Sequence, residues 1–155
     1  MKNKENIISN QKVIFQRAFK LAKAPIIISM FVTPTRYLLE LAGLPENIIF
    51  IIGLLWLALA FSIYWGIKLY SENHRYLLLL LSLMIFSPIS RIPVAILWWI
   101  DTRWEIGTHY SLYFDNFAQA FFQQMVYGSL TQIIPGFLLG SLILTIMRYR
   151  KLVTQ

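Results

Sequence analysis

The chain has 155 residues, of which 57% are hydrophobic and only 14% are charged. This composition excludes an ordinary soluble domain, because too few polar residues remain to cover its surface. The absence of cysteine excludes disulfides, thiolate nucleophiles and cysteine-ligated metal centres. The net charge is +7, but the basic residues lie mostly near the chain ends and at one turn, which is a pattern of membrane orientation. We therefore expect a lipid bilayer around the chain and no nucleic-acid partner.

Residues 1–23 predict a basic amphipathic segment on the cytoplasmic side, followed by a single transmembrane helical domain over residues 24–155. Helical spacing gathers lysines on one face of this segment and phenylalanines on another, so it can lie on an anionic leaflet. A simple extension that orients the first span is the alternative. No apolar core with a small-residue cleavage site follows, so we expect the segment to be retained.

Four stretches are apolar enough to cross a bilayer, which takes about 20 residues. The stretch at about residues 24–42 is interrupted by a proline and carries Arg36 and Glu40, which share a helix face and can pair. It is either a short span or a re-entrant segment. The other three spans are expected at about residues 47–69, 76–100 and 118–147.

These stretches predict an all-α integral membrane protein, a four-span transmembrane helical bundle with an N-terminal basic amphipathic helix. Residues 2–23 hold six Lys and Arg residues, whereas the loop 101–117 holds only Arg103. With four spans the basic regions share one side, and the positive-inside rule then places both termini in the cytoplasm. The basic amino terminus and the short loops favour a bacterial inner membrane.

Arg91 lies between Pro88 and Pro93, about nine residues or about 13 Å from the outer end of the third span. An arginine at this depth usually faces the bundle interior or water. Because the fourth span is polar at a similar depth, we expect a pocket open to the outer side that suits an anion, a carboxylate or a lipid phosphate. The expected ligand-binding residues are Arg91, Gln123, Gln124, Tyr127 and Thr131. The alternative is that Arg91 snorkels outward, or caps carbonyls freed by the two prolines.

Asp101, Glu105 and His109 follow an i, i+4, i+8 pattern and would align on a continued helix. Carboxylates and histidine can bind a divalent metal or transfer protons, so these three are the catalytic candidates. Gly107 interrupts the run, and a solvated acidic loop is the alternative. No metal site is assigned, and the cofactor stays unknown.

Three stretches resemble the middle helices of membrane acyltransferases that modify surface glycans: LWLALAFSIYW at 55–65, SPISR at 87–91 and YFDNFAQAF at 113–121. The resemblance implies a membrane-embedded transferase acting on a lipid-linked or surface-glycan substrate. This chain is far shorter than those enzymes and has no counterpart of their amino-terminal Arg/His motif, so the transferase is the alternative function.

The first expectation is a small polytopic membrane protein that acts by binding, as an accessory, immunity or assembly subunit of a membrane complex. The absence of Walker A, GxSxG, HExxH and CxxC motifs favours it. Gly136 and Gly140 have the small-residue spacing that lets two helices approach closely, so another membrane protein or a second copy of the chain is the expected partner. An oligomeric small-solute transporter lined by Arg91 and Gln124 is a further alternative, and the sequence leaves enzymatic activity open.

Overall fold

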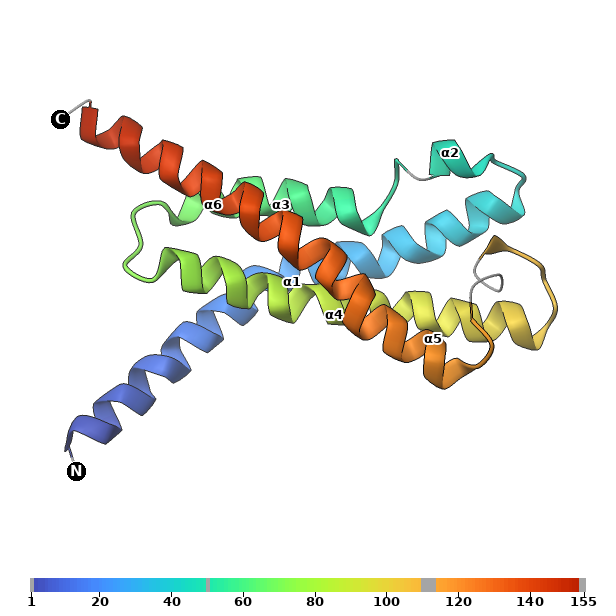
Figure 1. The fold of residues 1–155 in the computed structure, drawn as a ribbon, viewed down its shortest axis with the longest axis horizontal. Helices are drawn as coiled ribbons and strands as arrows, with labels where there is room; N and C mark the ends of the chain where they lie inside the picture. The colour runs from blue at the N-terminus through green and yellow to red at the C-terminus, as the bar shows by residue number, and fades with distance from the viewer. Residues whose placement is uncertain (1, 50, 110–113, 154–155) are drawn as a thin grey trace.

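The computed structural model describes residues 2–49, 51–109 and 114–153. Within these ranges the chain is helical and contains no strand (Figure 1). The elements are α1 (Lys2–Leu41), α2 (Glu46–Ile49), α3 (Leu54–Leu69), α4 (Arg75–Arg103), α5 (Phe117–Gln123), the π-helical segment η2 (Gln124–Gly128) and α6 (Ser129–Val153).

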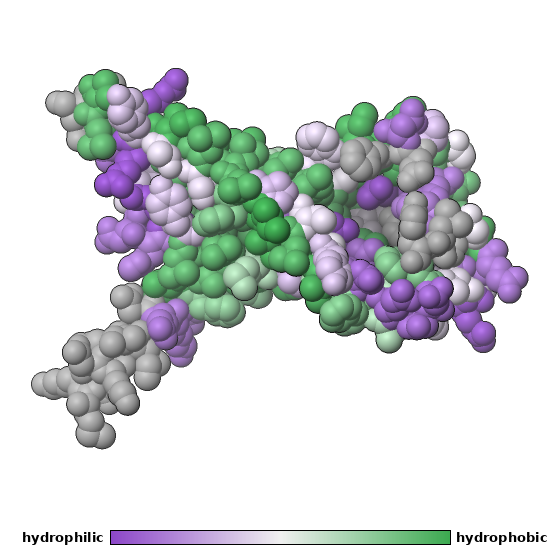
Figure 2. Space-filling model, viewed as in Figure 1, coloured by the Kyte–Doolittle hydropathy of each residue, from purple (hydrophilic) through white to green (hydrophobic). Residues whose placement is uncertain are grey.

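Three helical stretches among the described residues are long and apolar enough to cross a membrane: Asn47–Leu69, Arg75–Arg103 and Phe117–Val153. The middle of the surface is hydrophobic, and hydrophilic residues gather toward the two ends (Figure 2). Large apolar side chains such as Phe31 and Leu138 are exposed there. Monomeric soluble proteins rarely expose so much continuous apolar surface. The prediction of an all-helical protein whose apolar helices fit a multi-pass membrane location is therefore confirmed.

Helix α1 packs mainly against α4 through a stripe of small side chains. Its buried residues recur every three or four positions, as one helix face requires: Ala18, Ala22, Pro25, Ser29, Thr33 and Tyr37. The small residues bring the two backbones close enough for Ser82 Oγ to donate a hydrogen bond to the Ala18 carbonyl at 3.3 Å. Residues 2–23 and 24–41, which the sequence predicts as separate segments, thus lie on one helix that continues through two internal prolines.

The core lies among α3, α4 and α6, where Trp65, Leu83 and Leu144 are fully buried. Gly66 lets α3 approach α6, because a Cβ there would lie only 2.8 Å from Ile143 Cβ. Gly136 and Gly140, the expected helix-packing residues, lie inside the same junction, and both are buried. A Cβ on Gly136 would lie 2.8 Å from Ser62 Oγ, and one on Gly140 would lie 2.8 Å from Leu79 Cδ2. The two glycines therefore contact other helices of their own chain.

The stretch 47–69 is not one uninterrupted helix. Helix α2 ends at Ile49, and α3 begins after Gly53, whose backbone is extended with φ −125° and ψ 153°. A turn joins them, with the Ile52 amide donating to the Ile49 carbonyl at 3.0 Å. The 16 residues of α3 cover about 24 Å, less than the roughly 30 Å of bilayer hydrocarbon. The apolar stretch therefore reaches the length of a span only when α2 and the turn are counted with α3.

The alignment expected for Asp101, Glu105 and His109 does not occur, because α4 ends at Arg103. Glu105 adopts the left-handed conformation with φ 50°, and Gly107 follows with φ 82°. The Ile106 amide donates to the Asp101 carbonyl at 3.1 Å, the hydrogen bond of a Schellman helix end. The chain turns back at this point, so the three side chains do not share a helix face.

Candidate functional site

The guanidinium of Arg91 extends from the middle of α4 toward the π-helical segment η2. Arg91 Nη1 donates to Gln124 Oε1 at 3.2 Å, and Arg91 Nη2 donates to Thr131 Oγ1 at 3.4 Å. Gly128 makes room for it, because a Cβ there would lie 3.2 Å from Arg91 Cζ. Single π-helical turns often occur at functional sites, and here the wide turn places Gln124 and Gly128 on the side that faces Arg91.

Gln132 holds Arg91 from the side of α6 and is itself fully buried. With its amide oriented so that the oxygen faces donors, Gln132 Oε1 accepts from Arg91 Nε at 2.9 Å and from Nη2 at 3.1 Å. In the same orientation Gln132 Nε2 donates to Ser87 Oγ at 3.2 Å. The charge of Arg91 is thus solvated by side chains of the apolar stretch Phe117–Val153.

A cavity of about 200 Å³ lies beside Arg91, and we call it the arginine cavity. Its lining combines two arginines with aromatic and apolar side chains: Arg36, Leu54, Arg91, Val94, Trp98, His109, Phe114 and Gln124. The surface is hollowed among hydrophilic residues toward this end of the molecule (Figure 2). Two of the lining residues each hold a buried donor, Arg36 Nε and Trp98 Nε1, that has no acceptor within the described residues. Buried donors without an acceptor are rare in proteins.

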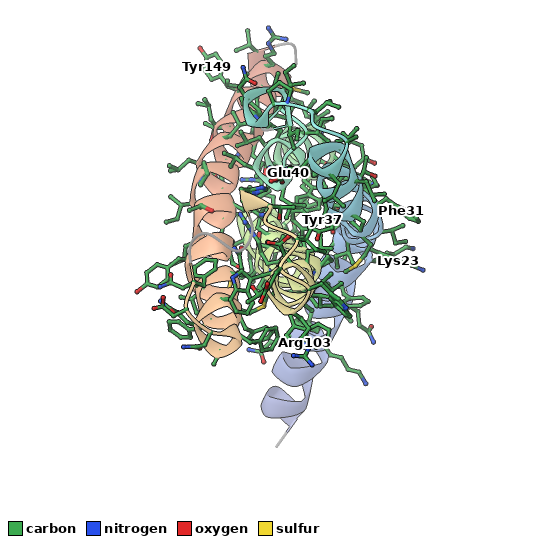
Figure 3. The ribbon with its side chains drawn as sticks, turned by 90° about the vertical axis from the view of Figure 1, so that its right-hand side faces the viewer. Lys23, Phe31, Tyr37, Glu40, Arg103 and Tyr149 are labelled. Carbon is green, nitrogen blue, oxygen red and sulfur yellow. The ribbon has the colours of Figure 1, made fainter. Side chains whose placement is uncertain are left out.

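His109, another residue of the lining, is paired with Glu40 of α1. The Glu40 carboxylate accepts from the His109 backbone amide at 2.7 Å, and its second oxygen contacts His109 Nδ1. Figure 3 shows Glu40 and Tyr37 toward the interior of the bundle, whereas Phe31 and Lys23 lie on its outer side. The expected pairing of Arg36 with Glu40 is not found, because His109 occupies that carboxylate. A carboxylate on Nδ1 fixes the orientation and the tautomer of an imidazole ring.

Asp101 is fully buried below the loop that follows α4. Its Oδ1 accepts from Tyr37 Oη at 3.3 Å and from the Thr108 amide at 3.2 Å. Glu105 is exposed, whereas Asp101 is buried and His109 is half-buried. No group of three or more potential metal ligands is found within the described residues. The contacts of Asp101 are those of a structural tie between α1 and the loop.

The structure brings together part of the expected pocket lining. Gln124 and Thr131 reach Arg91, but Tyr127 is exposed and contacts the ring of Phe122, with 6.3 Å between ring centroids. Gln123 makes no hydrogen bond to Arg91 among the described contacts. Gln124, Gly128 and Thr131 are four and seven positions apart and share one helix face, whereas Gln123 and Tyr127 lie to one side of it.

Four further residues contribute to the site without having been predicted for it: Arg36, Glu40, Gly128 and Gln132. For two of them the sequence holds a signal, because Gln124, Gly128 and Gln132 are spaced four apart and can share one face. Arg36 and Glu40 are on α1, and a spacing pattern within α1 cannot predict that this helix meets the loop after α4.

The arrangement suits recognition of an oxyanion. Guanidinium groups bind carboxylates and phosphates through paired hydrogen bonds, an indole N–H adds a donor, and a carboxylate-oriented imidazole can move a proton. Comparison of the chain with protein-family models, with curated proteins and with solved structures finds no match.

Proposed function

We propose that this chain acts by binding an anionic group, a carboxylate or a phosphate, in the arginine cavity. The observation that supports it most directly is the pair of buried donors, Arg36 Nε and Trp98 Nε1, that lack an acceptor among the described residues. An unsatisfied buried donor costs about 1–3 kcal/mol. An oxyanion that accepts from both donors beside Arg91 removes this cost and balances the positive charge.

We further propose that residues 24–42 form the first of four spans and that both termini face the cytoplasm of a bacterial inner membrane. Ile27, Ile28 and Phe31 of this stretch are exposed, as lipid-facing residues are. The termini lie toward the same end of the molecule, and the loop after α4 lies toward the opposite end (Figure 1). The positive-inside rule then directs the arginine cavity to the outer side.

In this setting the protein serves as an accessory, immunity or assembly subunit that engages an anionic group of a lipid or of a membrane partner. The cavity of about 200 Å³ is small, so it accommodates a headgroup or a single side chain, while any attached apolar chain stays outside.

The test uses the full chain in the neutral detergent dodecyl maltoside, with dodecyl phosphate as the probe. The two molecules share their tail, so any difference reports the phosphate. We expect dodecyl phosphate to raise the melting temperature of the wild-type chain by more than that of Arg36→Gln. Arg103→Gln is the matched control, since Arg103 lies outside the cavity lining and is exposed. Equal stabilisation of the Arg36→Gln and wild-type chains would contradict the proposal.

A transferase acting on a lipid-linked or surface-glycan substrate is the second candidate, and the contact of Glu40 with His109 favours it. A histidine oriented through Nδ1 is the usual form of a general base. In this function the arginines hold an anionic substrate group, and His109 transfers the proton in the same cavity.

The transferase is tested in cells that express the chain, by mass spectrometry of their lipid and glycan fractions. We expect a modified species with the wild-type chain and none with His109→Ala, provided that the purified variant keeps its melting temperature. Identical lipid and glycan profiles with and without the wild-type chain would exclude this candidate and leave the binding function.

A further inference from the structure

A second cavity, of about 410 Å³, lies between α1 and α3, and we call it the basic cleft. Its lining reaches the turn after α3 and shares no residue with that of the arginine cavity. Its lining joins cations with aromatic and aliphatic side chains: Arg17, Lys20, Leu21, Ala24, Phe61, Tyr64, Trp65, Lys68, Leu69 and Glu72.

The charges of the basic cleft are only partly balanced. Arg17 forms an ion pair with Glu72, which ties α1 to the turn after α3. Lys68 Nζ donates to Tyr64 Oη at 3.2 Å and lies 5.4 Å from the centre of the Tyr64 ring. Lys20 is exposed and forms no hydrogen bond or ion pair within the part of the chain that the structure describes. Three cations against one carboxylate leave the cleft with two positive charges, a composition that attracts an anion.

The floor of the basic cleft is apolar and continues along the outside of the bundle. Trp65 and Leu69 are fully buried beneath it. On α1, Ala24 in the cleft is followed four and seven residues later by Ile28 and Phe31, so all three share a face. Both later residues are exposed, and Figure 3 shows Phe31 on the outer side of α1. A ligand with a charged head at the cleft can therefore lay an apolar chain along this helix.

We propose that the basic cleft binds the headgroup of an anionic phospholipid, with the phosphate at Lys20 and Lys68 and an acyl chain along Ala24, Ile28 and Phe31. Basic pockets between helices at the cytoplasmic ends of membrane proteins bind such headgroups. Tyr64 places its hydroxyl beside Lys68, and tyrosine is the residue type that prefers the headgroup level. A soluble anion would use the lysines but not the apolar floor, so we assign the site to a lipid.

Native mass spectrometry of the full chain in a mild neutral detergent tests this assignment. Phosphatidylglycerol and phosphatidylcholine with the same acyl chains are titrated against the wild-type chain and two double variants. Lys20→Ala/Lys68→Ala removes both cleft lysines. Lys12→Ala/Lys23→Ala removes the same charge from α1 outside the cleft lining and is the matched control. Lys20→Gln is a milder third variant, because Lys20 has no partner to lose among the described residues, and circular dichroism checks each fold.

We expect one phosphatidylglycerol to bind the wild-type chain about tenfold more tightly than phosphatidylcholine, and the cleft variant to lose about that factor. The control variant should stay within about twofold of wild type, Lys20→Gln should lose a part of the affinity, and millimolar inorganic phosphate should not displace the lipid. Equal losses of affinity in both double variants would mean that overall charge, and not the cleft, determines binding, and would overturn the site. Unchanged affinity in the cleft variant, or displacement by inorganic phosphate, would overturn it as well.

Discussion

The Glu40 carboxylate accepts a hydrogen bond of 2.7 Å from the backbone amide of His109, 69 residues further along the chain. The same carboxylate contacts the ring Nδ1 of His109. Together with the hydrogen bond from Tyr37 to Asp101, it fastens the last turns of α1 to the loop that follows α4. Since Arg36 lies on these turns and His109 on that loop, the shape of the arginine cavity depends on this junction.

We predict that Glu40→Ala loosens the loop after α4. It removes both acceptors of His109, and hydrogen bonds to a charged group contribute about 1.5–3 kcal/mol each. Allowing for the partial exposure of the pair, the exchange of the backbone amides at Thr108 and His109 should accelerate at least about tenfold, which corresponds to about 1.4 kcal/mol. Hydrogen–deuterium exchange of the detergent-solubilised chain measures this directly.

Glu105→Ala is the control for that measurement. Glu105 is in the same loop and carries the same charge, but it is exposed and makes no described hydrogen bond. It should leave the exchange of His109 unchanged. Equal acceleration in the two variants would mean that lost negative charge, and not the contact with His109, loosens the loop.

We predict that Arg91 and Gln132 are energetically coupled. Arg91→Met removes the donor of two hydrogen bonds to the buried amide of Gln132, and Gln132→Leu removes the acceptor of the same two bonds, so each single change costs about 1–3 kcal/mol. The double variant removes both ends of one contact, and it should therefore be destabilised by less than the sum of the single variants. Unfolding in mixed detergent gives the four free energies. In the control pair, Arg103→Met and Gln132→Leu, the changes in unfolding free energy should add. If they also add for Arg91→Met and Gln132→Leu, the coupling is refuted.

The sequence predicts some contacts of Arg91 from the position of this residue in the middle of an apolar stretch. An arginine between two prolines needs partners at its own level, and the polar residues of the next span supply Gln124 and Thr131. It does not predict which polar residues, because several of them lie at a similar depth, and in the structure Tyr127 is exposed. Arg36 is missed for another reason. An i, i+4 pairing with Glu40 is the only partner that local spacing offers, whereas the actual partner of Glu40 comes from the loop after α4.

The break between α2 and α3 shows the limit of hydropathy in the same way. Residues 47–69 form one apolar stretch. Hydropathy predicts that such a stretch avoids water, but it does not predict where its backbone leaves the helix. Gly53 separates the two helices with an extended backbone that any residue can adopt, so its being glycine does not mark the break. The all-helical fold and its long apolar helices follow from composition, but the position of the break follows from tertiary packing.

We predict that Gly66→Ala destabilises the bundle although alanine favours helices by about 1 kcal/mol. The added Cβ would lie 2.8 Å from Ile143 Cβ and 3.0 Å from the Gly140 carbonyl, so α3 and α6 have to separate. Overpacking of this kind costs about 1–3 kcal/mol, and the melting temperature in detergent should fall.

Gly128→Ala is the matched control, because it makes the same chemical change at another helical position, in η2. There the nearest atoms are the ends of flexible side chains, Gln124 Oε1 at 3.0 Å and Arg91 Cζ at 3.2 Å. These can move by a few tenths of an ångström, so the melting temperature should hold or rise. A larger loss for Gly128→Ala than for Gly66→Ala would contradict the packing described for α3 and α6.

The membrane topology is the last prediction, and the cysteine-free sequence makes it simple to measure. Single cysteines at Gln11, Ser71, Glu105 and Tyr149 sample both ends of the bundle without background labelling, and all four positions are exposed. With four spans, a membrane-impermeant maleimide added to spheroplasts should label only Glu105→Cys, and the other three variants should react after permeabilisation. The physical reason is the charge distribution, since six Lys and Arg residues in 2–23 oppose translocation of the amino terminus. Labelling of Gln11→Cys from outside would mean that α1 does not cross, which would leave three spans.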